Sequence, residues 1–288
     1  MIEPISRRRF LLSSAAGLAA LGGVGAEPAK SRYKIAACDW MLLKRQKPSA
    51  IELAKQCGLD GVEVDMGKLG TRTELDNRLR NAEDRQQYQD ASKKYGVEIC
   101  SLALSALYGH SYADHPSADA ITDEWIETLH KMNVKVGFLP IGFQCDLVKD
   151  DAARKKVIAR LKRAAPAAEK AGVVLGLETG LDADGHRKLL EEIGSPAVQV
   201  YYNLGDRLEV GADIYGELRQ LGRDRICQIH CKEGNVHLGQ GKIDFKKVKA
   251  VLDEINWSGW LVIERSRLPN KSVLENFSAN ARYLKSIF

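Results

Sequence analysis

Polar side chains capable of metal and acid–base chemistry end several of the apolar runs in the second half of the chain. Four consecutive runs end in such a residue: Glu178, Asn203, His230 and Glu264. Two carboxylates close to each other repel unless a positive charge lies between them, and mixed oxygen and nitrogen ligands suit a divalent cation. If the four runs are neighbouring strands, their ends form a candidate metal site.

The run that contains His230 indicates which way these side chains point. Side chains alternate along a strand, so Gln228, His230 and Lys232 share one face of segment 226–232, while Cys227, Ile229 and Cys231 share the other. Ile229 suits a face covered by helices. We therefore expect His230 to point to the interior of the sheet, with Lys232 and Glu233 near the end of the strand.

Short β-branched runs alternate with helical stretches from residue 34 to the end of the chain. The expected strand-and-helix pairs are 34–38 with 48–57, 61–65 with 79–95, 97–105 with 118–131, 134–141 with 151–171, 173–178 with 185–193, 198–203 with 211–221, 226–232 with 245–255, and 259–264 with 273–287. Such an alternation predicts an α/β protein whose parallel strands close into a single (β/α)8 TIM barrel. A doubly wound open sheet is the alternative, but no Gly-x-Gly-x-x-Gly follows the first strand.

The N-terminal segment has the features of an export signal. Three arginines, Arg7 to Arg9, precede a weakly apolar run, and the small residues Val24-Gly-Ala26 follow as a cleavage site. The pattern resembles a twin-arginine signal, whereas the apolar run is shorter than the roughly 20 residues that span a bilayer. We expect a signal and linker over residues 1–30, a catalytic domain over 31–288, and a periplasmic or extracellular mature protein with no membrane segment.

Composition and cysteine positions exclude several classes of protein. The chain has 288 residues, a net charge of +5, and 28% charged residues, which is typical of a globular protein. Most of the six cysteines fall within expected strands, where a free thiol acts as a small hydrophobe, so we do not expect a disulfide framework for most of them. No Cys-x-x-Cys pair indicates a structural zinc site.

The order of these motifs resembles the xylose isomerase-like superfamily of sugar phosphate isomerases and epimerases. The resemblance rests on the strand-terminal residues, on the loop sequence Leu-Gly-Gln-Gly-Lys-Ile-Asp-Phe over 238–245, and on Gly-Leu-Asp-Gly-Val-Glu over 58–63. It covers residues 34–288 and specifies fold and metal site better than substrate. The endonuclease branch of the superfamily requires many more histidines than the six in this chain, so we expect no nucleic-acid partner.

The resemblance implies one divalent metal ion (Mn, Mg, Co or Zn) held by Glu178, His230 and Glu264. The family's remaining ligand is usually an aspartate, where this chain has Asn203, so either the amide oxygen coordinates the metal or Asp206 substitutes for it. The implied chemistry is proton transfer beside a carbonyl through an enediolate, with Glu178 and Glu264 moving the proton and Lys232 stabilising the oxyanion.

Other polar residues near strand ends are candidate substrate contacts, each with a structural alternative. An indole at Trp40 could stack on a sugar or pack under a loop, and Glu63 could touch substrate or hold polar groups at the barrel mouth. His110 and His237 fit either sugar contact or a surface loop. We also include Glu233 among the predicted substrate-binding residues.

Three functions remain open at this point. The first is a metal-dependent sugar isomerase or epimerase acting on a small carbohydrate. The second is an exported lyase or hydrolase of 3-keto-glycosides that uses the same site, and the third is a catalytically silent sugar-binding barrel, suggested by Asn203. A homo-oligomer is compatible with each of them.

Overall fold

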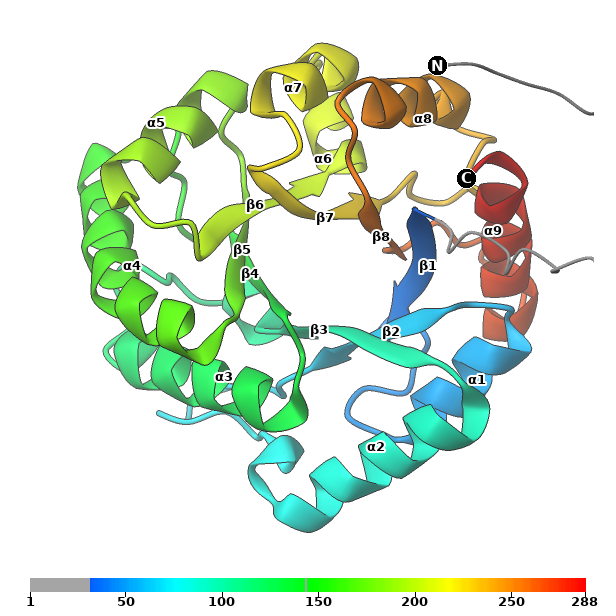
Figure 1. The fold of residues 1–288 in the computed structure, drawn as a ribbon, viewed down its shortest axis with the longest axis horizontal. Coiled ribbons are helices and arrows are strands. Elements are labelled where there is room, and N and C mark those ends of the chain that lie inside the picture. Colours follow the sequence, from blue (N-terminus) through cyan, green and yellow to red (C-terminus); the bar gives the residue numbers. More distant parts are fainter. Residues whose placement is uncertain (1–31, 143) are drawn as a thin grey trace, which may run out of the picture. The chain divides into compact units, whose positions relative to one another are not determined.

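The computed structural model describes residues 32–142 and 144–288, and the part from Arg32 to Phe288 forms one compact unit. The predicted export signal lies outside the described residues. Within this unit, the predicted (β/α)8 barrel is confirmed (Figure 1).

Eight parallel strands close into a barrel in sequence order. They are β1 (Tyr33–Cys38), β2 (Gly61–Asp65), β3 (Glu98–Ala103), β4 (Val136–Ile141), β5 (Val174–Thr179), β6 (Val198–Asn203), β7 (Ile226–Cys231) and β8 (Gly259–Ile263). Pairing of β1 with β8, with Tyr33 beside Gly259, closes the barrel. Because all strands run the same way, their carboxyl ends meet at one rim, which is where this fold builds its active sites.

Helices surround the strands as an outer ring (Figure 1). They are α1 (Ser49–Gln56), α2 (Ala82–Tyr95), α3 (Ala118–Met132), α4 (Asp151–Ala171), α5 (Ala183–Ile193), α6 (Leu204–Glu209), α7 (Ile214–Leu221), α8 (Phe245–Glu254) and α9 (Val273–Ile287), with 3-10 turns η1 (Arg78–Arg80) and η2 (Ser105–Tyr108). The main difference from the sequence-based prediction is the short helix α6, which follows β6 directly and was not predicted. The helix predicted over 211–221 is α7, and it begins three residues later, at Ile214.

Side-chain caps explain where several helices begin. Asp150, Asp182 and Asp244 each accept a backbone N–H of the first helical turn, and Ser272 forms a capping box with Glu275. These bonds satisfy amides that have no partner within the helix.

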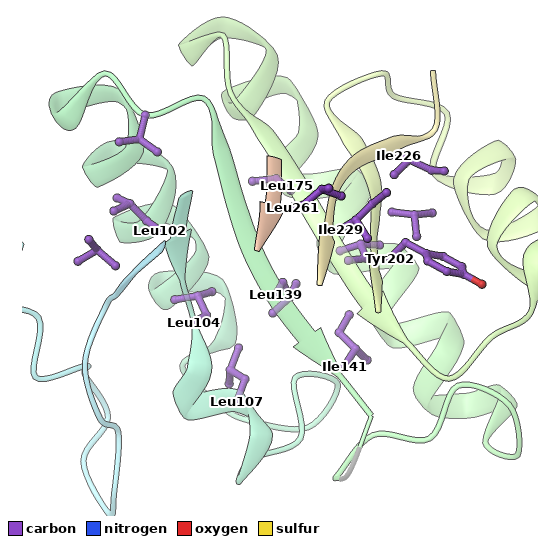
Figure 2. Packing of buried hydrophobic residues seen from close by; sticks show 14 of the residues in the cluster. Leu102, Leu104, Leu107, Leu139, Ile141, Leu175, Tyr202, Ile226, Ile229 and Leu261 are labelled. Atoms are coloured by element: carbon purple, nitrogen blue, oxygen red, sulfur yellow. The ribbon is translucent and has the colours of Figure 1, made fainter. Parts of the chain in front are cut away.

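The main hydrophobic core lies between the strands and the helices. Figure 2 shows leucine and isoleucine side chains of neighbouring strands packed in this layer, among them Leu102, Leu139, Leu175 and Ile229. Trp125 of α3 packs so closely on β4 that a Cβ at Gly137 would lie 2.0 Å from its ring. The close approach explains why the strand carries glycine there.

A second, smaller cluster fills the inside of the barrel. It consists of Ala36, Cys38, Cys100, Ala103, Phe138, Tyr201 and Val262. All six cysteines are free thiols, which agrees with the expectation that most of them are not in disulfides. Among the described residues, no helix is both long and apolar enough to cross a bilayer.

Candidate active site

The four strand-terminal residues predicted to act together converge at one end of the barrel. His230 lies opposite Asn203 in the β6–β7 pairing, and Glu264 directly follows β8. One ligand atom each from Glu178, His230 and Glu264 lies within 4.8 Å of the other two, and all three residues are buried. Consecutive parallel strands thus bring together residues that are far apart in the sequence.

Asn203 links the two glutamates through its amide nitrogen. Its Nδ2 donates to Oε2 of Glu178 at 2.9 Å and to Oε2 of Glu264 at 3.0 Å. Its Oδ1 accepts the backbone N–H groups of Gly205 and Asp206, both at 3.1 Å, and so caps α6. Because backbone N–H groups only donate, they fix the amide oxygen on the helix side and the nitrogen on the site side.

The orientation of Asn203 differs from that expected of a metal ligand. An amide coordinates a hard cation through its oxygen, and here that oxygen already accepts two hydrogen bonds. Asp206, the residue expected to replace Asn203 as a metal ligand, instead pairs with the ammonium of Lys232. The same ammonium lies 3.7 Å from Oε2 of Glu264. The structure therefore presents a donor at the fourth position of the site.

His230 lies between two carboxylates and is fully buried. Its Nδ1 is 2.8 Å from Glu178 Oε2 and its Nε2 is 3.1 Å from Glu63 Oε1. Burial lowers the pKa of His230, but the carboxylates of Glu63 and Glu178 outweigh it and hold that pKa well above its usual value. The ring orientation is fixed from both sides.

The two catalytic candidates differ in their electrostatic surroundings. Burial raises the pKa of Glu178, more than its hydrogen bond to His230 lowers it. Burial also acts to raise the pKa of Glu264, but the charges of His230 and Lys232 outweigh it and hold that pKa below its usual value. Environments that shift two carboxyl groups in opposite directions are typical of acid–base pairs.

Glu63 supports His230 from inside the barrel. It is fully buried and accepts hydrogen bonds from Ser101 and Tyr201 on Oε2, and from Cys38 on Oε1, besides facing His230. Of the two interpretations of Glu63, the structure agrees with the one in which it holds polar groups in place. Glu63 has no exposed surface, and substrate contact by this residue stays a prediction.

Tyr108 is a site residue that the sequence analysis did not identify. Its hydroxyl lies 3.0 Å from Oε1 of Glu178 and 3.2 Å from Oε1 of Glu264, at the end of the 3-10 turn η2. The same segment drew attention to His110, which instead stacks edge-on against His115. The sequence signal that could have identified Tyr108 is its position in the segment that follows β3, at the rim where this fold builds its active sites.

The remaining residues predicted to contact substrate are hydrogen-bonded or packed against other parts of the protein. Glu233 accepts the backbone N–H groups of Gly239 and Ile243, and His237 lies 2.8 Å from Asn276 Oδ1, so both hold the loop after β7. Trp40 packs against the interior cluster beneath the guanidinium of Arg45. Substrate contact by these residues and by His110 stays a prediction.

A cavity of about 730 Å³ opens beside the converging carboxylates. Glu178, Tyr108 and Asp206 line it, together with residues of the segments after β4 and β5 and of α6. Its volume lies in the roughly 300–1,000 Å³ range of pockets that hold small-molecule ligands. Substrate therefore has access to Glu178 from this side.

The donor set fits a divalent cation at three positions. Glu178, His230 and Glu264 offer two carboxylates and an imidazole within 4.8 Å, the combination that such cations bind. The Glu63 carboxylate behind His230 is the outer partner that metal-bound histidines usually have. Only the Asn203 nitrogen does not fit as a ligand.

Comparisons with known proteins agree with this architecture. A family model described as xylose isomerase-like TIM barrel matches residues 51–287. A 2-epi-5-epi-valiolone 7-phosphate 2-epimerase of an Actinoplanes species is 27% identical over 205 residues, covering 70% of this chain and 73% of that protein. A putative L-ribulose-5-phosphate 3-epimerase of Escherichia coli K12 is 28% identical over 244 residues, covering 75% and 82%.

Solved structures share the fold at low sequence identity. The D-psicose 3-epimerase of Clostridium cellulolyticum H10 superposes with a TM-score of 0.70 at 15% identity, covering 88% of this chain and 99% of the other. The 3-keto-D-glucoside 4-epimerase of Escherichia coli gives 0.68 at 18% identity, again covering 88% and 99%.

Proposed function

Because the chain belongs to the xylose isomerase-like TIM barrel family, we propose that it is a metal-dependent sugar isomerase or epimerase that moves a proton beside a carbonyl. Its curated relatives are named as sugar epimerases, which supports an enzyme of the isomerase and epimerase type. The observation that carries the proposal is the convergence of Glu178, His230 and Glu264 next to an open cavity.

Glu178, His230 and Glu264 would hold the metal, which is Mn, Mg, Co or Zn. When bound, the metal supplies Lewis-acid polarisation of the substrate carbonyl, which acidifies the adjacent C–H. Fixed by Glu63 behind it, His230 keeps its Nδ1 toward Glu178 and the site. Asn203 holds both carboxylates in register through its amide nitrogen.

Proton transfer itself falls to the two glutamates. Glu178 and Glu264 approach the site from different strands, so one can remove a proton and the other can return it on the opposite side of the carbon. Lys232 lies against Glu264 and can stabilise negative charge that develops on a substrate oxygen. The Tyr108 hydroxyl contacts both carboxylates and orients them.

Isotope exchange tests this proposal without knowledge of the natural substrate. The mature protein, loaded in turn with each metal, is incubated in D2O with a panel of ketohexoses, ketopentoses and ring-ketone sugars. We expect deuterium at the carbon next to the carbonyl, dependent on metal and lost after chelation. Bound metal without exchange into any of these sugars would instead favour the silent sugar-binding barrel.

Elimination is a second outcome of the same proton abstraction. The cavity beside Glu178 has room for a leaving group, and this supports a lyase of keto-glycosides as the second candidate function. Mass analysis of the products separates the two, since isomerisation conserves substrate mass and elimination splits the substrate.

Export by the twin-arginine pathway is part of the proposal and rests on residues 1–30. Replacing Arg7 and Arg8 by lysine keeps the charge and removes the paired arginines that the receptor reads. We expect the unaltered chain to be recovered outside the cytoplasm, cleaved after the small residues at 24–26, and the double variant to stay inside.

A further inference from the structure

Cys38 brings a thiol into the barrel interior that the proposed mechanism does not use. It ends β1, belongs to the interior cluster and has no exposed surface. Its Sγ lies 3.4 Å from Oε1 of Glu63 and 3.8 Å from Nε2 of His230, and Nε2 and Oε1 are 3.1 Å apart. A thiol, a carboxylate and an imidazole thus meet on the Nε2 side of His230, whereas Nδ1 faces Glu178.

The three atoms have the spacing of ligands around one zinc ion. Zinc binds its ligands at tetrahedral angles, with bonds of about 2.3 Å to sulfur and roughly 2.0–2.2 Å to nitrogen and oxygen. Ligand atoms on such bonds lie about 3.4–3.6 Å from one another. The three separations given above each lie within about 0.3 Å of this spacing. Small shifts therefore suffice to bring all three atoms onto one ion.

The charge of this group of side chains also suits a divalent cation. Glu63 is fully buried, and a buried carboxylate needs a compensating positive charge, which protonated His230 supplies. A divalent ion would replace the Nε2 proton of His230 and the thiol proton of Cys38, and both protons would leave to solvent. The net charge of the group stays the same, so binding of the ion adds no uncompensated charge.

A second, independent feature of the barrel interior is a buried oxygen without a donor. Gln228 precedes His230 by two residues on β7 and is fully buried. Its Nε2 donates to the carbonyl of Cys100 at 2.8 Å, which leaves Oε1 as an acceptor, and no residue in the described ranges donates to this oxygen. Ser101, the neighbour of Cys100, donates to Glu63. A bound water or ion is one explanation of such an atom, and a water that completes a zinc site is a donor of this kind.

The geometry points to a second metal site inside the barrel, in which Cys38, Glu63 and Nε2 of His230 bind a thiophilic divalent cation such as Zn²⁺ or Cd²⁺. Thiolate and imidazole ligands favour these ions. The rim site (Glu178, Nδ1 of His230 and Glu264) is richer in oxygen and suits Mg²⁺ and Mn²⁺ better. The interior site lies on the other side of the same imidazole and does not depend on the proposed function.

Because the two sites share His230, they are alternatives to each other. A neutral imidazole has one nitrogen with a free lone pair and one that carries a proton. With a cation on Nε2, the proton stays on Nδ1 and points to Oε2 of Glu178, 2.8 Å away. Nδ1 then has no lone pair for the metal of the rim site, and this consequence alone rests on the proposed function. A thiophilic ion would therefore inhibit the enzyme without entering its substrate cavity.

Cadmium absorption tests the sulfur ligand directly. Cd²⁺ is added to the mature protein both in its folded state and during refolding from urea, because ligands without exposed surface must open before they exchange. We expect a sulfur-to-cadmium charge-transfer band that is complete at one equivalent and absent from Cys38→Ser. Cys231→Ser should keep the band, because Cys231 is equally buried and adjacent to His230 in sequence, but packs in the core between strands and helices. Circular dichroism checks that both variants fold.

X-ray absorption at the zinc edge tests the same ligand in the unaltered chain. With one equivalent of Zn²⁺, we expect one sulfur neighbour at about 2.3 Å and otherwise nitrogen or oxygen. A zinc shell without sulfur would overturn the inference. A cadmium band that survives in Cys38→Ser, or the lack of any band in the unaltered chain, would overturn it as well.

Two further measurements separate the interior site from the proposed function. Glu264→Gln, which alters only the rim site, should keep the cadmium band. Mn²⁺ bound at the rim site, followed by electron paramagnetic resonance, should weaken cadmium binding about tenfold. Cadmium binding that ignores bound Mn²⁺ would overturn the alternation at His230. If Mn²⁺ does not bind and the cadmium band appears, the proposed function fails while the interior site stands.

Discussion

The amide nitrogen of Asn203 lies 2.9 Å from Oε2 of Glu178, the same oxygen that faces Nδ1 of His230 at 2.8 Å. One carboxylate oxygen thus receives both the amide donor of β6 and the imidazole of β7. The relationship places a neutral hydrogen-bond donor where the resemblance to related enzymes implies an aspartate ligand. The site therefore carries one negative charge fewer than it would with an aspartate at position 203.

Asn203→Asp should change metal affinity and apo stability in opposite directions. The aspartate can keep the helix cap through one oxygen, while the other places a third carboxylate beside Glu178 and Glu264. Without metal, repulsion and the lost donor should lower the free energy of unfolding by about 1–3 kcal/mol. With metal, the added charged ligand should tighten binding by about tenfold.

Metal titration and urea unfolding of the apo protein measure the two effects. Asn280→Asp is the matched control, because Asn280 is also buried and hydrogen-bonded, but its partners are the backbone of Leu238 and Ser266 rather than the carboxylates of Glu178 and Glu264. It should lose stability and keep its metal affinity. An unchanged affinity in Asn203→Asp would show that the side chain at 203 does not face the metal.

Glu178→Gln and Glu264→Gln should each abolish proton exchange while leaving the fold intact. The amide cannot accept a proton from carbon, and general acid–base groups contribute roughly 10²- to 10⁴-fold in rate. Exchange rates measure the loss, and circular dichroism checks the fold. Glu209→Gln, a carboxyl group in the same cavity outside the cluster, should keep the rate. A near-normal rate in either site variant would contradict the two-glutamate assignment.

Glu63→Gln should weaken metal binding although Glu63 is not a proposed ligand. Its carboxylate faces Nε2 of His230 and accepts three further hydrogen bonds, and loss of such an outer partner typically lowers metal affinity about 10–100-fold. Affinity is measured by competition with a chelator. Glu217→Gln controls for loss of a buried carboxylate, since Glu217 pairs with Arg207 and Tyr202 instead. Equal metal affinity in both variants would mean that Glu63 has only a structural role.

His186 should make the protein less stable in acid. Nδ1 lies 3.0 Å from the carbonyl of Asp182 and so carries the proton, while Nε2 accepts from Thr179. Burial lowers the pKa of His186 to about 4. The unfolded chain, with an ordinary pKa of about 6.5, takes up the proton first, so stability present above that value falls by about 3 kcal/mol as the pH drops to 4.

Urea unfolding at pH 7, 5.5 and 4 measures this dependence. His186→Gln, which does not titrate, should show a shallower decline in the free energy of unfolding than the unaltered chain. His130→Gln, on the exposed part of α3, should retain the original slope. Parallel declines in all three proteins would show that His186 does not cause the effect.

Much of the fold could be predicted from the sequence because its signals are local. Local sequence is enough to predict strands from runs of β-branched residues, and helices from helical stretches and caps such as Asp150. Eight repeats of strand and helix are then compatible with few architectures. Boundaries were less certain: the short helix α6 was missed because its start depends on the Asn203 side chain. The cap of α5 is Asp182, whose Oδ1 accepts the N–H of Gly185.

The sequence by itself determined the barrel and the set of polar residues at its strand ends, because strand alternation and parallel order bring Glu178, His230 and Glu264 to one rim. Tertiary structure decided what these residues contact. The direction of the Asn203 amide depends on the backbone N–H groups of α6, and Tyr108 reaches the carboxylates only through the fold of η2. The cavity joins loops after β4 and β5 with α6, and such distant segments meet only when the chain is folded.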